Sequence, residues 1–180
     1  DELREIVRRI EKILEDHART IEEVIERIRD ILRKHEKLVE EVLRRIEKLL
    51  KELEEMVRRG ELDEETVRRV EREIEDLLRR AKEHSEEVKK RIEELLERLR
   101  RHSRDVERAI DELVKKVRER GVEGTEDLER MAERVKRELE RLNKKAEDAL
   151  REVKRALDDL DRDLKRVLEE IKERIRRATT

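Results

Sequence analysis

An 18-residue repeat runs through three long segments of this chain, and it constrains the fold more than any other feature. Residues 10–27, IEKILEDHARTIEEVIER, show the pattern in full. In the first segment, residues 28–45 repeat residues 10–27, and residues 46–59 begin a third copy. In the second segment residues 95–112 repeat 77–94, and in the third residues 158–175 repeat 140–157. At about 3.6 residues per turn, one repeat makes five whole helical turns, so the apolar stripe returns to the same face without supercoiling. The repeat therefore predicts long, nearly straight helices.

The chain has three glycines and no proline, and each glycine stands where one helix is expected to end and the next to begin. Gly60 follows two arginines, and cations favour the last turn of a helix while glycine favours the position just beyond it. Asp63 is a suitable N-cap for the next helix, and Thr125 repeats this role after Gly121 and Gly124. The expected helices are 2–59, 63–120 and 125–178.

Loops of only a few residues make consecutive helices antiparallel neighbours. The predicted fold class is therefore all-α, an up-down-up antiparallel three-helix bundle of long, nearly straight helices. We expect a single domain over residues 1–180. At about 1.5 Å per residue each helix would be roughly 80–90 Å long, so the expected shape is a rod.

Composition excludes several classes of partner. Charged residues make up 58% of the chain and aromatic residues 0%, and there is no cysteine. A chain with this many charged residues could be disordered. Its apolar residues recur at helical spacing, however, which favours packed helices. The 51 basic and 53 acidic residues are mixed along the chain and give a net charge of −2. Without a basic surface or aromatic rings for base stacking, we expect no nucleic-acid partner.

The sequence also gives no signal for a membrane. It contains no run of 18 apolar residues and begins DELREIVRR. We therefore expect neither a membrane-spanning segment nor a signal peptide.

Six polar residues interrupt the apolar stripe at repeat-equivalent positions: His17 and His35, His84 and His102, and Asn143 and Asp161. When the chain is folded back about its two loops, they fall into two cross-sections about 27 Å apart along straight helices. The first layer contains His17, His102 and Asn143, with Thr20 and Ser103 nearby, and the second contains His35, His84 and Asp161, with Ser85 nearby.

The spacing predicts that these layers are buried hydrogen-bond networks. A buried imidazole needs partners for both nitrogens, which hydroxyl, amide and carboxylate groups can supply. Such a layer adds little net stability over apolar packing. A slipped register, however, leaves each polar group buried and unpaired at a cost of about 1–3 kcal/mol. We therefore predict that the layers specify helix register and pairing.

Two chemical alternatives use the same residues. His35, His84 and Asp161 could together ligate Zn²⁺ or another divalent ion. The sequence lacks the Glu-x-x-His and His-x-x-x-His pairs of bundle metal sites, which favours a structural network. Catalysis is disfavoured because a filled three-helix core offers no cleft, and the adjacent His–Ser pairs point in different directions on a helix. The sequence thus predicts no catalytic, cofactor-binding or metal-binding residue.

Taken together, the 18-residue periodicity, the capped short loops, the lack of aromatics and the repeated polar layers resemble de novo designed, parametrically generated three-helix bundles with buried hydrogen-bond networks. The resemblance covers the whole chain. It implies a synthetic scaffold with no natural biochemical function and no native localisation, produced recombinantly in a cytoplasm. It also implies no required partner and no cofactor, with use as a monomer or as a precursor for split or fused helical assemblies.

Two other functions remain open. A spectrin-like spacer that docks other proteins would share the helices, but such helices usually carry buried aromatic residues. A bundle that responds to pH or metal would use the same histidines. Burial should depress the pKa of histidines in the layer without a carboxylate, whereas Asp161 should stabilise an imidazolium in the other layer.

Overall fold

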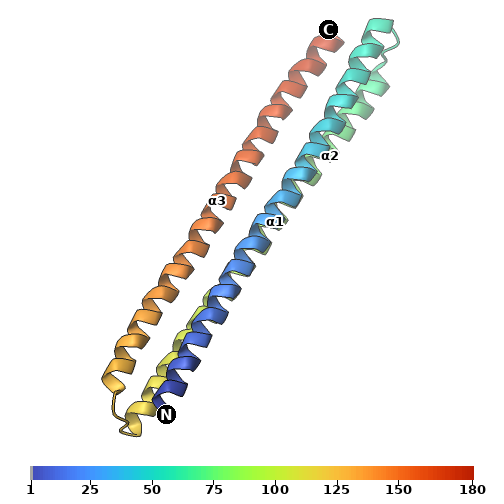
Figure 1. Cartoon of the computed structure of the whole chain (residues 1–180). Coiled ribbons are helices and arrows are strands. Elements are labelled where there is room, and N and C mark those ends of the chain that lie inside the picture. The colour runs from blue at the N-terminus through green and yellow to red at the C-terminus, as the bar shows by residue number, and fades with distance from the viewer. Residues whose placement is uncertain (1) are drawn as a thin grey trace. The chain divides into compact units, whose positions relative to one another are not determined.

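A computed structural model describes residues 2–180, and it consists of three long helices joined by two short loops (Figure 1). The helices are α1 (Glu2–Arg59), α2 (Glu64–Glu119) and α3 (Thr125–Thr179), and residues 2–180 contain no strand. Each helix begins with acidic residues and ends with basic ones, which complements the helix dipole. The predicted all-α, up-down-up three-helix fold is confirmed.

The first loop closes α1 with a Schellman motif. Gly60 adopts φ +70°, its N–H donates to the carbonyl of Val57 at 3.1 Å, and the next N–H, of Glu61, donates to Met56 at 3.0 Å. Asp63 then caps α2, because its carboxylate accepts the backbone N–H of Thr66 at 2.7 Å. The turn thus satisfies backbone groups that both helix ends would otherwise leave unpaired.

The second loop differs from the sequence prediction in one respect. Gly121 and Gly124 both have positive φ, as expected of loop glycines. Thr125, however, is already helical, and its hydroxyl donates to the carbonyl of Val122 instead of accepting a helix N–H. Leu128 bonds to the carbonyl of Gly124, so the glycine occupies the N-cap position. The Thr125 hydroxyl therefore stabilises the loop and does not cap the helix.

The positive φ at Gly60 leads to a testable difference between two substitutions. We expect Gly60→Ala to lower the free energy of unfolding by about 1–2 kcal/mol, because a Cβ is unfavourable in the left-handed region. Gly60→Asn should cost less, since asparagine tolerates this conformation. Apart from Gly60 and its two chain neighbours, no heavy atom lies within 4 Å of the added Cβ, so steric clashes with the rest of the described chain do not affect the comparison. Guanidinium unfolding followed by circular dichroism measures both, and equal losses would contradict the explanation.

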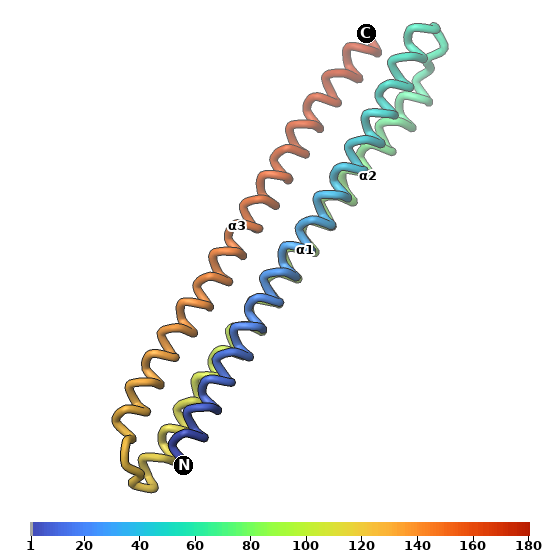
Figure 2. The backbone as a smooth tube through the Cα atoms, in the orientation of Figure 1, coloured from blue at the N-terminus to red at the C-terminus, as the bar shows by residue number. Residues whose placement is uncertain are grey.

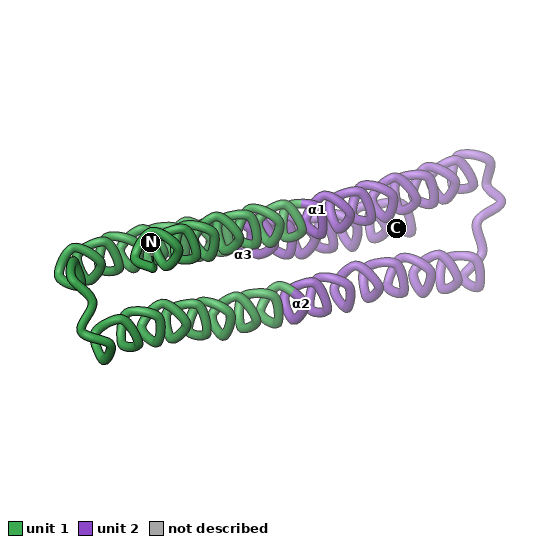
Figure 3. The backbone as a smooth tube through the Cα atoms, turned by 60° about the horizontal axis from the view of Figure 1, so that its bottom comes forward, with its two compact units in different colours: residues 1–29, 92–152 green, residues 30–91, 153–180 purple. Residues whose placement is uncertain are grey.

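The chain divides into two compact units, each built from parts of all three helices (Figure 3). Unit 1 comprises residues 1–29 and 92–152, and unit 2 comprises residues 30–91 and 153–180. The N-terminal end of α1 lies beside the α2–α3 loop in unit 1, where Glu2 pairs with Arg120 (Figure 2).

Apolar clusters lie at different levels of unit 1. One contains Ile6 and Ile10 of α1, Ile110 of α2 and Leu139 of α3, together with smaller residues. The other contains Ile21 and Ile25, Leu99, Ala146 and Ala149. In all three helices, the residues of the predicted first layer lie in sequence between these clusters, so a polar level separates two apolar ones.

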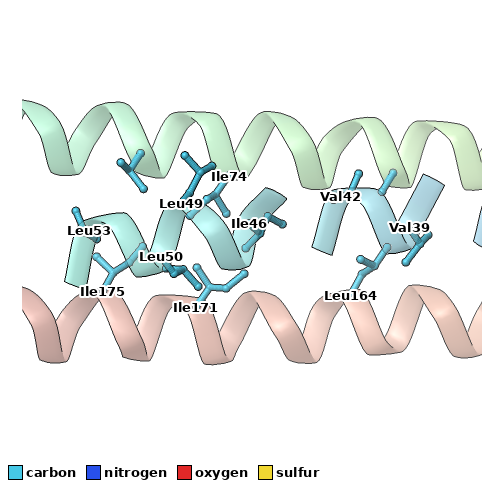
Figure 4. Close-up of a cluster of buried hydrophobic side chains, with 12 residues drawn as sticks. Val39, Val42, Ile46, Leu49, Leu50, Leu53, Ile74, Leu164, Ile171 and Ile175 are labelled. Atoms are coloured by element: carbon cyan, nitrogen blue, oxygen red, sulfur yellow. The ribbon is translucent and has the colours of Figure 1, made fainter. Parts of the chain in front are cut away.

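Unit 2 contains an extended apolar cluster, shown in Figure 4. Ile46, Leu49, Leu50 and Leu53 of α1 face Ile74 of α2 on one side, with Leu164, Ile171 and Ile175 of α3 on the other. Leu50 and Leu53 are almost completely buried. Burial of this kind, at about 25 cal/mol per Å² of apolar surface, is the main source of stability in a chain without aromatics.

Charged side chains cover the outside of both units, and no large hydrophobic residue among 2–180 is exposed. Most ion pairs join residues three or four apart on one helix, and such exposed pairs contribute at most about 1 kcal/mol each. Within the described residues, none of the helices is both long and apolar enough to span a bilayer.

Candidate functional site

The first polar layer lies in unit 1 and joins one histidine pair to an amide and a hydroxyl. His17 of α1 is completely buried, Ser103 of α2 is 7% exposed and Asn143 of α3 is half-buried. The fourth member, His102 of α2, is exposed at the rim. The Nδ1 atoms of the two histidines are 3.0 Å apart and form a hydrogen bond.

Three of these residues form a closed triangle. Ser103 Oγ donates to Asn143 Oδ1 at 2.7 Å, and His17 Nε2 lies 3.0 Å from Ser103 Oγ and 3.2 Å from Asn143 Oδ1. Because Asn143 Oδ1 only accepts and the serine proton is already used, His17 Nε2 must carry the proton and donate. Neutral His17 therefore accepts at Nδ1, and His102 supplies the Nδ1 proton of the pair.

The second layer lies in unit 2 and repeats the histidine pair closely. His35 of α1 is completely buried, and its Nδ1 is 2.8 Å from Nδ1 of His84 on α2. The ring centroids are 5.0 Å apart, against 5.1 Å in the first layer, and both pairs have an interplanar angle of 16°. In each pair, only one of the two facing Nδ1 atoms can carry a proton.

The rest of the second layer is different. Asp161 does not bond to a histidine, because its Oδ2 accepts a hydrogen bond from Lys89 Nζ of α2 at 2.9 Å. Lys89 also pairs with Asp158 at 3.1 Å. Among the described residues, His35 Nε2, Ser85 Oγ and Asp161 Oδ1 are buried without a hydrogen-bond partner.

The surroundings lower the pKa of both buried imidazoles, those of His17 and His35. Burial is the largest cause of the lowered pKa of His17, which the Asn143 hydrogen bond opposes and the charge of His102 reinforces. Burial likewise lowers the pKa of His35, with a further lowering from His84 and Lys89 that Asp161 opposes. The Asp161 hydrogen bond is the main cause of the raised pKa of Lys89. Both buried histidines are thus held neutral, as a desolvated base should be.

One predicted neighbour does not join its layer. The Thr20 hydroxyl donates to the carbonyl of Asp16, one turn earlier in α1, at 3.0 Å. A threonine in a helix commonly makes this bond to its own backbone, and here it removes the donor from the network.

Conversely, sequence reasoning missed Lys89. The signal was present in the repeat, because Lys89 occupies the position that Glu107 occupies one repeat later. This reversal of charge accompanies the change from Asn143 to Asp161 on α3.

The arrangement offers little for metal chemistry. In residues 2–180, no group of three or more His, Cys, Asp or Glu side chains is arranged to hold a metal ion. The physical reason is visible in the second layer, where His35 and His84 use their Nδ1 atoms on each other and Asp161 is bound by Lys89. A large surface groove in unit 1, about 920 Å³, is lined mostly by charged residues and includes none of the histidines.

Comparison with known proteins supports the fold. The chain matches no protein-family model, and no curated protein matches it. It is similar to a solved structure described as "Computationally designed three helix bundle", with 24% sequence identity and a TM-score of 0.68. The match covers 98% of this chain and 87% of that chain.

Proposed function

We propose that this protein is a designed structural scaffold whose buried polar layers specify which helix faces pair, and in which register. The observation that carries the proposal is the closed triangle of His17, Ser103 and Asn143, because each helix contributes one member. The interpretation assigns the protein no catalytic step, no cofactor and no required partner.

Register needs such a marker in this chain because the apolar stripe is so regular. Leucine, isoleucine and valine recur along every helix, so a neighbouring helix shifted by one turn would still find apolar side chains to contact. The same shift would separate the atoms of the triangle and leave buried donors and acceptors unpaired, at about 1–3 kcal/mol for each group. A polar layer thus penalises slipped pairings that apolar packing tolerates.

The designed origin has separate support. The 18-residue repeat, the complete lack of aromatic residues and the glycine-terminated short loops follow rules of idealised helical construction. The solved structure with the same fold is described as computationally designed. A natural spacer that docks other proteins is less well supported, because among residues 2–180 no large hydrophobic side chain is exposed to form a docking surface.

The register proposal is tested by making both layers apolar in the full chain. The changes are His17→Leu, Ser103→Ala, Asn143→Leu, His35→Leu, Ser85→Ala and Asp161→Leu. His84→Ala and His102→Ala remove the two histidines that would otherwise lose their Nδ1 partners. We expect the free energy of unfolding to stay equal or rise, since apolar replacement of buried polar groups is often neutral or stabilising. We also expect several species in place of one, detected as extra amide resonances and as dimers in light scattering.

Variants with only one layer replaced are the matched controls. Each keeps one polar level and should retain a single set of amide resonances. If the fully apolar variant also remained a single monomeric species, the layers would not be needed for register, and the proposal would fail.

A second function, response to pH, is favoured by one observation. Both buried histidines, His17 and His35, have lowered pKa values, so the folded state resists the proton that the unfolded chain accepts. Acid should therefore weaken the bundle.

A further inference from the structure

The second polar layer contains three buried atoms whose hydrogen-bonding capacity is unused. They are His35 Nε2, Ser85 Oγ and Asp161 Oδ1, one from each helix of unit 2. His35 and Ser85 are both 0% exposed, so bulk solvent does not reach their side chains. An unpaired buried polar group is unfavourable, so three at one level require an explanation.

Unit 1 provides an internal comparison. The repeat-equivalent atoms there are His17 Nε2, Ser103 Oγ and Asn143 Oδ1, and all three bond to one another at 2.7–3.2 Å. In unit 2 none of the three corresponding bonds is formed. The two histidine pairs have nearly the same geometry, so the difference lies in the other two corners, Ser85 on α2 and Asp161 on α3.

Lys89 explains why the Asp161 corner of the triangle is open. Asp161 directs Oδ2 to the Lys89 ammonium at 2.9 Å, which leaves Oδ1 buried but not bonded to Ser85 or His35. In unit 1 the position equivalent to Lys89 is Glu107, whose ionised carboxylate has no donor and so cannot bond to Asn143 Oδ1. Two differences between the repeats, Lys89 for Glu107 and Asp161 for Asn143, thus separate the α3 corner from the other two.

We propose that the open triangle of unit 2 is a binding site for a single water molecule, bonded to His35 Nε2, Ser85 Oγ and Asp161 Oδ1. Water has the required chemistry, because it donates to the carboxylate oxygen and can donate to or accept from the imidazole and hydroxyl. Buried waters typically make about three hydrogen bonds to polar groups that would otherwise be unpaired. This site goes beyond the register function and does not depend on it.

The charges at the site favour a neutral ligand. The Lys89 ammonium already compensates Asp161, and it would repel a second cation at the other oxygen of the same carboxylate. The site also lacks the third His, Cys, Asp or Glu ligand that a divalent ion would need within the described residues. In unit 1 the direct bonds of the triangle leave no corner free for water.

The native chain gives the first test. A high-resolution crystal structure of the full protein should show a water oxygen within hydrogen-bond distance of His35 Nε2, Ser85 Oγ and Asp161 Oδ1. Direct bonds among these three atoms, or a gap without water density, would overturn the proposal. This readout needs no variant and therefore does not depend on the folding of one.

The second test exchanges the residues that distinguish the repeats. Lys89→Glu with Asp161→Asn copies unit 1 and should close the triangle, and Lys89→Met with Asp161→Asn is the milder form if that double variant folds poorly. Oxygen-17 magnetic relaxation dispersion counts long-lived buried waters, and we expect one fewer per molecule than in the native chain. An unchanged count in a variant with native helicity would refute the assignment.

The reciprocal variant is the matched control. Glu107→Lys with Asn143→Asp gives unit 1 the residues of unit 2, and we expect one additional long-lived water. A count that stayed at the native value in this folded variant would show that the exchanged residues do not govern the site.

Discussion

At pH 5.5 we expect the protein to unfold at a lower guanidinium chloride concentration than at pH 7.5. Burial lowers the pKa of His17 and His35 in the folded state below the ordinary value of about 6.5 that they regain on unfolding. Above pH 6.5 neither state binds these protons. Below it the unfolded chain binds more, so stability is present above this pH and is lost as the pH falls toward the lowered folded pKa.

The geometry of the histidine pairs gives a structural reason why protonation should destabilise the folded state. His17 faces His102 and Asn143, and it accepts the Nδ1 proton of His102. A second proton on His17 would place a donor on both facing nitrogens, so the Nδ1–Nδ1 bond would be kept only if His102 gave up its Nδ1 proton. His35 has the same conflict with His84, and Lys89 opposes its protonation while Asp161 favours it.

The expected slope follows from linkage. Each proton that only the unfolded chain binds removes about 1.4 kcal/mol of stability per pH unit, so the two histidines together can reach about twice this slope. The comparison stops at pH 5.5 because most carboxylates, with ordinary pKa values near 4, remain ionised there. The measurement is a series of guanidinium titrations at intermediate pH values.

A His17→Leu, His35→Leu variant is the control for this experiment. It removes both buried bases and should lose most of the pH dependence between 7.5 and 5.5. Equal midpoints for the native chain at the two pH values would show that the buried histidines do not couple protonation to folding.

The fold could be predicted from the sequence because its signals are local and repeated. The 18-residue period gives helices, and Gly60 and Gly121 end two of them, since a positive φ just beyond a helix favours glycine. Thr125 shows the limit of such reasoning. Its hydroxyl could accept a helix N–H or donate to a loop carbonyl, and the path of the loop, which the residue type does not determine, favours the second.

The repeat spacing brought His17, Ser103 and Asn143 to one level, but it also assigned Thr20 to a layer that it does not join and missed Lys89. Folding the chain about its loops indicates which residues share a level, because straight helices keep a constant rise per residue. It does not indicate side-chain torsions, and these decide that Thr20 bonds to its own helix and that Asp161 turns toward Lys89. A closer comparison of the repeats would have helped, since Lys89 and Glu107 differ in charge at equivalent positions.

Truncating Leu139 to alanine is expected to have the largest effect of any single change proposed for this protein. Leu139 of α3 is 1% exposed and belongs to the apolar cluster of unit 1 with Ile10 and Ile110. Leu139→Ala removes buried methyl groups and leaves a cavity that long helices packed on both sides cannot fill by collapsing. The free energy of unfolding should fall by about 2–5 kcal/mol, measured by guanidinium titration at pH 7.5.

Leu142→Ala is the matched control, because it makes the same chemical change three residues later on α3 at a partly buried position. Helix propensity changes equally in both variants, so a larger loss at Leu139 isolates the effect of burial. The Leu139→Ala protein should nevertheless keep one set of amide resonances, because the triangle of His17, Ser103 and Asn143 is intact. Replacing the polar layers with apolar residues should have the opposite result. The free energy of unfolding should be preserved, but several species should appear in solution in place of one. If Leu139→Ala instead produced several species at full stability, apolar packing would be setting the register, and the assignment of roles would have to be exchanged.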